Sequence, residues 1–117
     1  MTAEDIVRDA LAHLADGHVF EDVADQGVRL PWIVYQVAGG KIYVDLSGNA
    51  YDKCCRRVQV AVWHGTAKGR SSLMRQVVRA LVNPEVGAIP IGAPNNVFER
   101  ETRLYGSRLD VSVSVEF

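Results

Sequence analysis

Residues 56–64 read RRVQVAVWH, and this alternating stretch decides the fold class. Its alternate positions form two faces, one of valines and one of mixed polarity: Val58, Val60 and Val62 against Gln59, Ala61 and Trp63. A period of two residues is typical of a strand that is buried on one face only. The stretch therefore predicts a half-buried strand of an antiparallel sheet.

The same alternation recurs on both sides of this stretch. Residues 41–46 read KIYVDL, and residues 32–37 read WIVYQV directly after Pro31, a residue that is tolerated at the start of a strand. The C-terminal stretch, residues 107–117, directs an apolar set inward: Leu109, Val111, Val113, Val115 and Phe117. A sheet with one apolar face needs covering elements on that face only.

Two helices are predicted to provide this cover. The first begins at Thr2, whose spacing to Asp5 fits a capping box, and it has Gly17 as its C-cap. The second runs from Thr66 to about Val82, where an Asn-Pro pair stops it. Each has an apolar stripe at helical spacing: Ile6, Val7, Ala10, Leu11 and Leu14 in the first, and Leu73, Met74, Val77 and Leu81 in the second.

The remaining segments are rich in glycine, proline, asparagine or acidic residues and are predicted as loops and turns. They are residues 18–27, 39–40, 47–49 and 84–96, the last with a short extended piece near residues 88–91. A closing hairpin starts with a strand over residues 96–101 and turns near Tyr105-Gly106. The sequence thus predicts one α+β domain, residues 1–117. We expect a single mostly antiparallel sheet with two helices packed on one face, in the order α-β-β-β-α-β-β.

Length and composition are those of one ordinary globular domain. The chain has 117 residues, of which 48% are hydrophobic and 23% charged, and domains typically contain about 100–150 residues. No apolar run approaches the roughly 20 residues that a bilayer-spanning helix needs. Residues 1–10 are acidic and amphipathic, unlike the basic and then apolar regions of a signal peptide. We expect neither secretion nor a membrane partner.

The net charge of -1 hides an asymmetry along the chain. Residues 1–52 carry 3 basic and 9 acidic side chains, a balance of -6, whereas residues 53–117 carry 10 basic and 5 acidic ones, a balance of +5. If the fold keeps these halves on different faces, one side of the molecule is acidic and the other basic. Unlike faces suit head-to-tail packing of identical copies, which can close into rings. A scattered and solvated charge distribution is the alternative.

One segment comes near a phosphate-binding motif. Residues 65–71 read GTAKGRS between a strand and a helix, which is where a phosphate loop belongs. However, three residues instead of four separate the two glycines, and Arg70 stands in place of the lysine that reaches the phosphates. A solvated turn at the start of a helix explains the segment better. A phosphate-binding module is kept as an alternative.

The histidines and cysteines form no metal or catalytic motif. Neither CxxC nor HxxxH spacing occurs among the three histidines and two cysteines. The two cysteines, Cys54 and Cys55, are adjacent, and since a disulfide between neighbours is strained we expect free thiols. Arg56 and Arg57 are expected to favour a lowered thiol pKa, so a small thiol-dependent enzyme is a second alternative. The main prediction is a protein that is not an enzyme and needs no cofactor or metal.

The second helix carries a basic stripe opposite its apolar one. The stripe consists of Lys68, Ser72, Arg75 and Arg79, and the further residues Lys53, Arg56 and Arg57 could extend it into a basic patch. A solvated helix face is the ordinary explanation. Nucleic acid is disfavoured by the pI of 6.3 and the lack of an aromatic platform. We expect contact with an acidic surface of a neighbouring protein, with the loop of residues 48–55 as a contact arm and Tyr51 at its tip.

Four segments carry a resemblance to a known family through their order and spacing. They are a short helix followed by residues 18–27 (HVFEDVADQG), residues 30–36 (LPWIVYQ), residues 57–63 (RVQVAVW), and residues 98–105 (FERETRLY) running into residues 109–113 (LDVSV). A proline, an aromatic and a β-branched strand, then a strand that ends in an aromatic, then a closing hairpin are typical of the tail-completion family of long-tailed bacteriophages. Over residues 1–117 the chain resembles this family, which includes the tail terminators of prophages and gene transfer agents.

The resemblance implies a role in assembly. The resemblance implies that the chain, like other members of the family, forms a ring, generally hexameric, on the head-proximal end of a completed tail tube. It also implies that single copies are often monomeric before they meet the tail. Such a ring stops tube polymerisation and docks to the head connector. The implied partners are therefore other copies of the chain, the tail tube protein and the head connector or neck protein. The implied location is the virion, with the host cytoplasm during assembly. A neck or head-completion protein that joins connector to tail is the alternative within this class.

Overall fold

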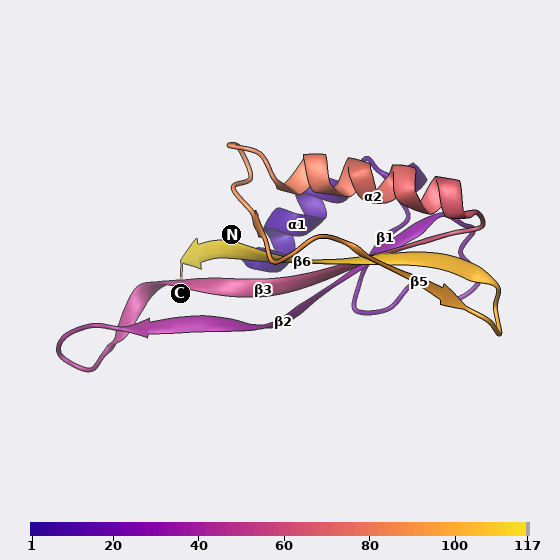
Figure 1. Ribbon diagram of the computed structural model, residues 1–117. Helices are drawn as coiled ribbons and strands as arrows, with labels where there is room; N and C mark the ends of the chain where they lie inside the picture. Colours follow the sequence, from indigo (N-terminus) through magenta and orange to yellow (C-terminus); the bar gives the residue numbers. More distant parts are fainter. Residues whose placement is uncertain (117) are drawn as a thin grey trace.

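The computed structural model describes residues 1–116, with two α-helices on one face of a six-stranded sheet (Figure 1). The elements in chain order are α1 (Ala3–Leu11), a 3₁₀ turn (Ala15–Gly17), β1 (Val19–Glu21), β2 (Trp32–Val44), β3 (Ala50–His64), α2 (Ala67–Leu81), β4 (Ile89–Pro90), β5 (Asn95–Glu99) and β6 (Leu104–Glu116). The predicted α+β class and element order are confirmed, with the two-residue β4 as the extended piece expected near residue 89. The inward orientation predicted for Phe117 lies outside the described residues.

The central strand of the sheet is β3, which contains the alternating stretch of residues 56–64. The strand order is β1-β2-β3-β6-β4, and β5 also pairs with β6. β3 runs antiparallel to β2 on one side and to β6 on the other, where the register extends from His64 opposite Tyr105 to Lys53 opposite Glu116. Only the short β1 pairs in a parallel sense, with β2. The sheet is therefore mostly antiparallel, as predicted.

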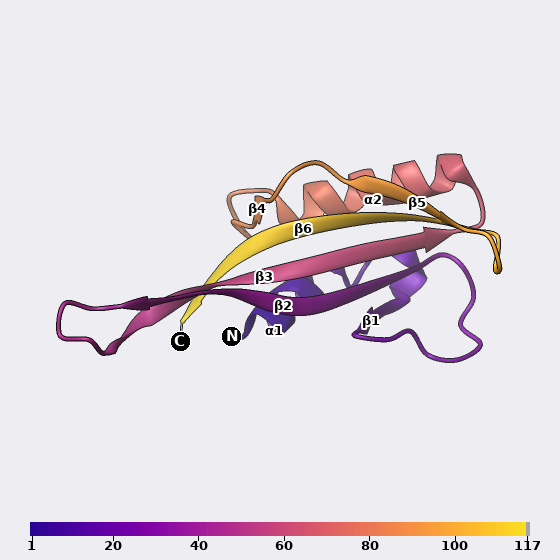
Figure 2. The ribbon, with the colours of Figure 1, turned by 60° about the horizontal axis from the view of Figure 1, so that its bottom comes forward.

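The core lies between the sheet and both helices. The fully buried side chains of the central strands all point to the helix-covered face: Ile33, Val58, Val60, Val62, Leu109, Val111 and Val113. Against them pack Val7 and Leu11 from α1, and Val77 and Leu81 from α2. The other face of the sheet has no helix over it, and Figure 2 shows its strands from a second direction. One-sided cover thus explains the alternation in the sequence.

Both helices begin at the predicted threonine caps. The backbone N–H of Asp5 donates to Thr2 Oγ1 (3.1 Å), and the Thr2 N–H donates back to the Asp5 carboxylate (3.2 Å). The Thr2 backbone donor is the main cause of a lowered pKa at Asp5, because it stabilises the ionised carboxylate. At α2, the Gly69 N–H donates to Thr66 Oγ1 (3.0 Å). These bonds satisfy N–H groups that helices otherwise leave unpaired.

The first helix is shorter than predicted. It ends at Leu11, and Gly17 closes a separate 3₁₀ turn instead of capping the helix. Between them Leu14 is extended (φ -92°, ψ 162°) and buried. Leu14 thus reaches the core from an extended residue after the helix rather than from a further helical turn.

The predicted turn at Gly39-Gly40 was wrong, since β2 continues through both residues to Val44. Val37 pairs with Val58, and the next pair is Gly40 with Arg56. Two residues of β2 therefore lie opposite one residue of β3 between these pairs, so β2 holds one extra residue there. Such an insertion is a β-bulge, and the two glycines supply the positive φ angles (86° and 133°) that the local geometry requires. The chain reverses later, at residues 45–49.

Two smaller corrections concern segments that pack on the sheet. Val19 and Phe20 do not lie in a loop but in β1, a parallel edge strand beside β2. The final hairpin turns at residues 100–103, and Gly106 lies within β6. A Cβ atom at Gly106 would lie 2.7 Å from the Trp63 ring. The glycine therefore makes room for the tryptophan on the neighbouring strand rather than forming a turn.

Candidate protein–protein interface

The β2–β3 hairpin projects from one end of the molecule (Figure 1). The described part of β6 ends where Glu116 pairs with Lys53, and the two strands continue beyond it as a ribbon. Every residue from 39 to 53 is exposed, and we call this segment the arm. The molecule consequently measures 53 × 26 × 26 Å. A two-stranded ribbon has no core of its own, so both faces of the arm are exposed to solvent in the single chain.

The tip of the arm is ordered by its own hydrogen bonds. The Asp45 N–H donates to the Asn49 carbonyl oxygen (2.8 Å). Asp45 Oδ1 accepts from the N–H groups of Ser47 and Asn49, both at 2.9 Å. Gly48, with φ +85°, completes the reversal. An aspartate that binds backbone N–H groups ahead of it is a standard turn former. The tip therefore keeps its shape without help from the body and holds Leu46 fully exposed.

The arm carries a concentration of exposed apolar side chains. They are Ile42, Tyr43, Val44, Leu46 and Tyr51. Ile42 and Val44 are 60% and 66% exposed, although isoleucine and valine are among the residues most often buried. Along residues 36–44 the outer edge of β2 also has no partner strand within the described chain, because β1 covers only residues 33–35. Exposed apolar patches and free strand edges are typical of surfaces that another protein covers.

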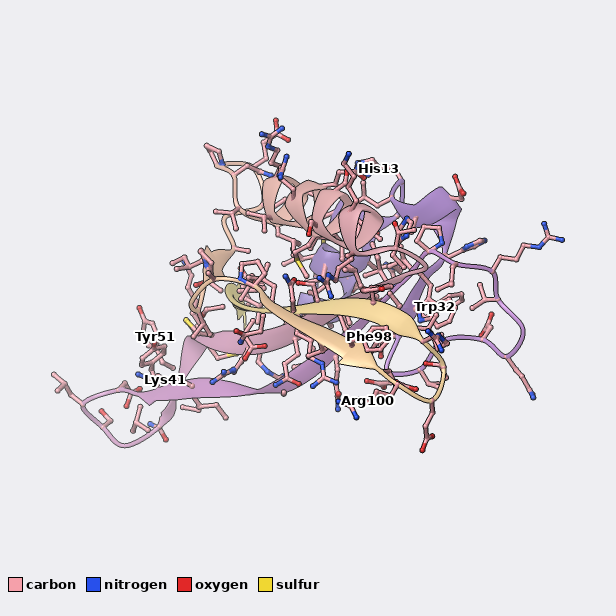
Figure 3. The ribbon with its side chains drawn as sticks, turned by 45° about the vertical axis from the view of Figure 1, so that its right-hand side comes forward. His13, Trp32, Lys41, Tyr51, Phe98 and Arg100 are labelled. Carbon is pink, nitrogen blue, oxygen red and sulfur yellow. The ribbon has the colours of Figure 1, made fainter. Side chains whose placement is uncertain are left out.

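The arm differs in detail from the predicted contact loop. Residues 50–55 belong to β3, and Tyr51 is an exposed strand residue rather than the tip. The tip is instead occupied by Leu46, which the alternation of residues 41–46 places on one face of a predicted strand. Figure 3 shows Tyr51 and Lys41 on the arm and Trp32 at the opposite end of the molecule. The turn-forming DLSGN sequence of residues 45–49 was the signal that could have located the tip.

The predicted basic residues do not form one patch. Arg56 and Arg57 are neighbours in β3 and so point to opposite faces of the sheet. Arg57 lies on the face without helices, where its guanidinium forms an ion pair with Asp110. The Arg56 Nε donates to the Gly39 carbonyl oxygen (3.2 Å) at the bulge. These two arginines therefore have structural partners at the base of the arm and are separated from the basic residues of α2.

The predicted stripe on α2 consists of exposed cations. Lys68, Arg75 and Arg79 are all exposed, and residues 66–84 contain no aspartate or glutamate. A cation in the first helical turn opposes the helix dipole, and the like charges of Arg75 and Arg79 stand four residues apart. Both features weaken an isolated helix by a few tenths of a kcal/mol. Helix stability therefore does not explain this charge pattern.

The acidic and basic halves of the chain do not occupy separate faces. β2, from the acidic half, lies between β1 and the mainly basic β3. α1 also lies against α2 on the same side of the sheet. The hypothesis of one acidic and one basic side was therefore wrong at the level of whole halves. Charge is segregated locally instead, with cations alone on α2 and acids alone at the arm tip and in residues 9–28.

Cys55 has two hydroxyl neighbours on the face without helices. Tyr43 Oη donates to its sulfur, and the Ser114 hydroxyl lies at the same distance of 3.6 Å. The Ser114 hydroxyl, followed by that of Tyr43, lowers the pKa of the Cys55 thiol, because both stabilise the thiolate. The neighbouring arginines, which the sequence suggested, are not the cause. Cys54 points to the other face, where it is buried, and both thiols are free.

We predict that Cys55 reacts with iodoacetamide well before Cys54 in the folded protein. The thiolate is the reactive form, and only Cys55 combines partial exposure with a lowered pKa. A Ser114→Ala variant should shift the pH profile of Cys55 alkylation to higher pH, because a bond to the thiolate is lost. Peptide mass spectrometry over a pH series measures both rates. Equal labelling of the two cysteines before unfolding would contradict the prediction.

No thiol–imidazole pair links Cys55 with His64. Nine residues of continuous strand separate them, which corresponds to about 30 Å at roughly 3.3 Å per residue. His64 ends β3, and Cys55 lies in the first half of the same strand, far from it. The arrangement that nucleophilic catalysis by a cysteine would need is not built from this pair.

The glycine-rich segment of residues 65–71 is the first turn of α2. The Gly69 N–H is already bound by the Thr66 side chain, and the Thr66 N–H donates to His64 Nδ1 (3.2 Å). A Cβ atom at Gly69 would overlap the His64 ring. A phosphate loop needs N–H groups that point freely at the ligand. The glycine here serves the packing of His64, so the geometry favours the turn over a phosphate site.

The described chain offers neither a metal-binding cluster nor a membrane-spanning helix. Within residues 1–116, no three His, Cys, Asp or Glu side chains gather in a way that could hold a metal ion. No helix of that range has the length and apolar character needed to cross a membrane. What these residues do present is exposed surface, apolar on the arm and basic on α2.

The fold and these surfaces define a class of protein, a small α+β subunit that assembles with other proteins. The chain belongs to the family of tail completion protein gp17, whose family model matches residues 6–116. No curated protein matches the chain. It is thus a structural protein of bacteriophage tail assembly that is located in the virion tail and interacts with tail and head proteins. The family resemblance drawn from the order of four sequence segments is confirmed.

Proposed function

We propose that copies of this chain form a ring, with six copies as the expected number, on the head-proximal end of a completed tail tube. The ring stops the addition of further tube subunits and offers its other face to the head connector. The chain is made in the host cytoplasm and becomes part of the virion during assembly. The observation that carries this proposal is the arm, whose exposed apolar side chains have no cover within one copy.

The charge pattern of α2 supports a ring rather than an isologous dimer. A ring needs two different surfaces on each copy that fit each other. The arm tip is acidic and apolar, whereas α2 carries cations without acids. Because unlike surfaces on identical copies pair head to tail, such subunits can close into a ring.

Electron microscopy of particles made after deletion of the gene tests the proposed function. Overlong or irregular tails beside unattached full heads are expected, because nothing would stop tube growth. Tails of normal length that fail to join heads would instead identify a neck protein. Normal infectious particles would refute both roles.

We predict that Arg75→Glu combined with Arg79→Glu weakens association with other copies or with tails. The two reversals replace attraction to an acidic surface by repulsion, and about a tenfold rise in the dissociation constant is expected at low ionic strength. The loss should shrink as salt rises, because exposed charges are screened. Co-sedimentation with purified tails measures it. Gln76→Glu, also exposed on α2, is the matched control, and unchanged association of the double variant would remove these arginines from the interface.

A further inference from the structure

A groove runs between α2 and the start of β5, and Figure 2 shows these two elements side by side above β6. Met74 and Val78 from α2 and Pro94 from the segment before β5 give it an apolar lining. Arg75 stands at its rim and is exposed. The cavity has a volume of about 270 Å³. It is therefore large enough for one aliphatic side chain and its adjoining backbone, but not for a whole helix.

One polar group in this groove lacks a partner. Ser107 is only 1% exposed and lines the groove, and its hydroxyl makes no hydrogen bond within the described chain. Buried hydroxyl groups are nearly always bonded, because an unbonded one has lost water without compensation. The groove thus offers an apolar lining with a single free hydrogen-bonding group. This combination fits a short segment that brings both an aliphatic side chain and backbone polar groups.

The arm tip has the properties that complement this groove. Leu46 is fully exposed on a rigid turn, with backbone carbonyl and N–H groups on both sides of it. Asp45 directly precedes it, Asp52 lies two residues beyond Ala50 on the returning strand, and residues 42–52 contain no lysine or arginine. The groove lies on α2, where residues 66–84 contain no acidic residue. Shape, polarity and charge therefore agree between the two surfaces.

We propose that the arm tip of one copy docks into the α2–β5 groove of the next copy. Leu46 enters the apolar lining, the acids beside it face Arg75, and the Ser107 hydroxyl bonds a backbone group of the turn. The inference rests on the proposed function, since it describes how the copies of the ring meet. A chain cannot fill its own groove, because its arm points away from the body that carries α2 (Figure 1). Each copy supplies one arm and one groove, which is the pairing that generates a ring.

A second acidic segment could compete for the basic helix, namely residues 16–25 with the exposed Val23. This segment is bound to the body, since the Asp22 N–H donates to the Tyr35 carbonyl oxygen (2.9 Å). The arm in contrast extends beyond the body along the 53 Å axis of the molecule. The arm is therefore the segment that reaches a neighbouring copy, and Val23 serves as the control position.

Disulfide trapping in assembled tails tests the contact. A Leu46→Cys, Asn96→Cys variant places thiols on the arm tip and at the groove, and Cys55→Ser removes the reactive native thiol. Tails made with this chain are isolated, treated with diamide and run on a non-reducing gel. We expect a ladder of products that extends beyond two copies, because head-to-tail contacts link each copy to the next. The matched control, Leu46→Cys with Val23→Cys, should give no ladder.

Each other outcome has a definite meaning. Products that stop at two copies would overturn the proposal, since they indicate an isologous contact. A ladder in the Val23 control alone would place the arm on another surface, and a product with the tube subunit would make the tube its partner. Each of these two results would overturn the proposed docking site and leave the proposed ring function standing. Absence of the chain from tails would refute the proposed function and this inference together.

A charge exchange gives a second test that needs no added cysteine. Asp52→Lys and Arg75→Glu each should weaken association with tails by about threefold, because each sets like charges against each other. The two changes combined should recover most of that loss. Asp22→Lys, in the competing acidic segment, should have no effect. A combined variant that is weaker than either single one would overturn the proposed pairing.

Discussion

Replacing Leu46 by aspartate should leave the chain folded and abolish its ability to terminate tails. Leu46 is fully exposed in the single copy, and exposed substitutions usually change stability by less than about 0.5 kcal/mol. In the docked arm the same side chain is buried, and full burial of a leucine contributes about 1.5–3 kcal/mol. Loss of this burial free energy raises the dissociation constant of one contact by about ten- to a hundredfold. The carboxylate adds a desolvation cost in an apolar groove.

The ring multiplies this loss, because each copy contributes one such contact. Complementation of a deletion strain with Leu46→Asp should give the overlong tails of the deletion itself, measured by negative-stain microscopy. Val23→Asp is the matched control, since Val23 is an exposed apolar residue of the body. It should restore normal tails. Normal tails from Leu46→Asp would show that the arm tip is not needed for assembly, whatever the deletion alone produces.

Sequence reasoning succeeded where burial decides the pattern. Val58, Val60 and Val62 are all buried because helices cover only one face of β3, and a period of two residues records this directly. The helix caps at Thr2 and Thr66 were equally predictable, since they depend on side chains within three residues of the helix start. Local chemistry and one-sided burial thus account for the fold class.

The predictions failed where a residue's partner is far away in the chain. Gly39-Gly40 has the composition of a turn, but pairing with β3 makes it a bulge. Gly106 also suggested a turn, yet its role is to accommodate Trp63 from another strand. Leu46 follows the alternation of residues 41–46 and was therefore predicted as part of a strand, although β2 ends at Val44. Long-range pairing of this kind leaves no periodic signal around the residue itself.

The exposure of the candidate contact residues was predictable from the sequence only in part. The α2 cations were identified by helical spacing alone, and the structure leaves them exposed. Arg56 and Arg57 were grouped with them because of their charge, whereas adjacent strand residues necessarily diverge. Sequence also gave no indication of the groove, which needs α2 and β5 to lie together across the outer edge of β6.

The arm carries a risk that its own residues reduce. A free strand edge with apolar side chains promotes aggregation in a single copy. Lys41, Asp52 and Lys53 place charges among those side chains, and charged residues on an edge discourage unspecific pairing. The arm thus combines an apolar tip for a specific groove with charged flanks near its base. The charged flanks thus reduce unspecific pairing along the free edge of the arm.

Substitution of Gly40 by alanine should destabilise the chain by about 3 kcal/mol or more. Gly40 has a φ of 133°, which side-chain-bearing residues rarely adopt, and its Cβ would overlap the Cys55 carbonyl oxygen and lie 2.8 Å from the Arg56 Cα. Strained backbone costs about 1–3 kcal/mol and overpacking a similar amount. Since domains are stable by only about 5–15 kcal/mol, the urea midpoint should fall markedly.

Gly39→Ala is the matched control for this prediction. Gly39 also has a positive φ (86°), but a Cβ there would meet no atom within 4 Å. Backbone strain alone should lower the free energy of unfolding of the Gly39→Ala variant by about 1 kcal/mol. Equal losses of stability in the Gly39→Ala and Gly40→Ala variants would therefore contradict a clash at the bulge. Gly40→Ala should also fail in tail termination, since the bulge sets the direction of the arm. It would then lose function together with stability, whereas Leu46→Asp loses function at unchanged stability. Comparing the two separates the support of the arm from the contact that its tip makes.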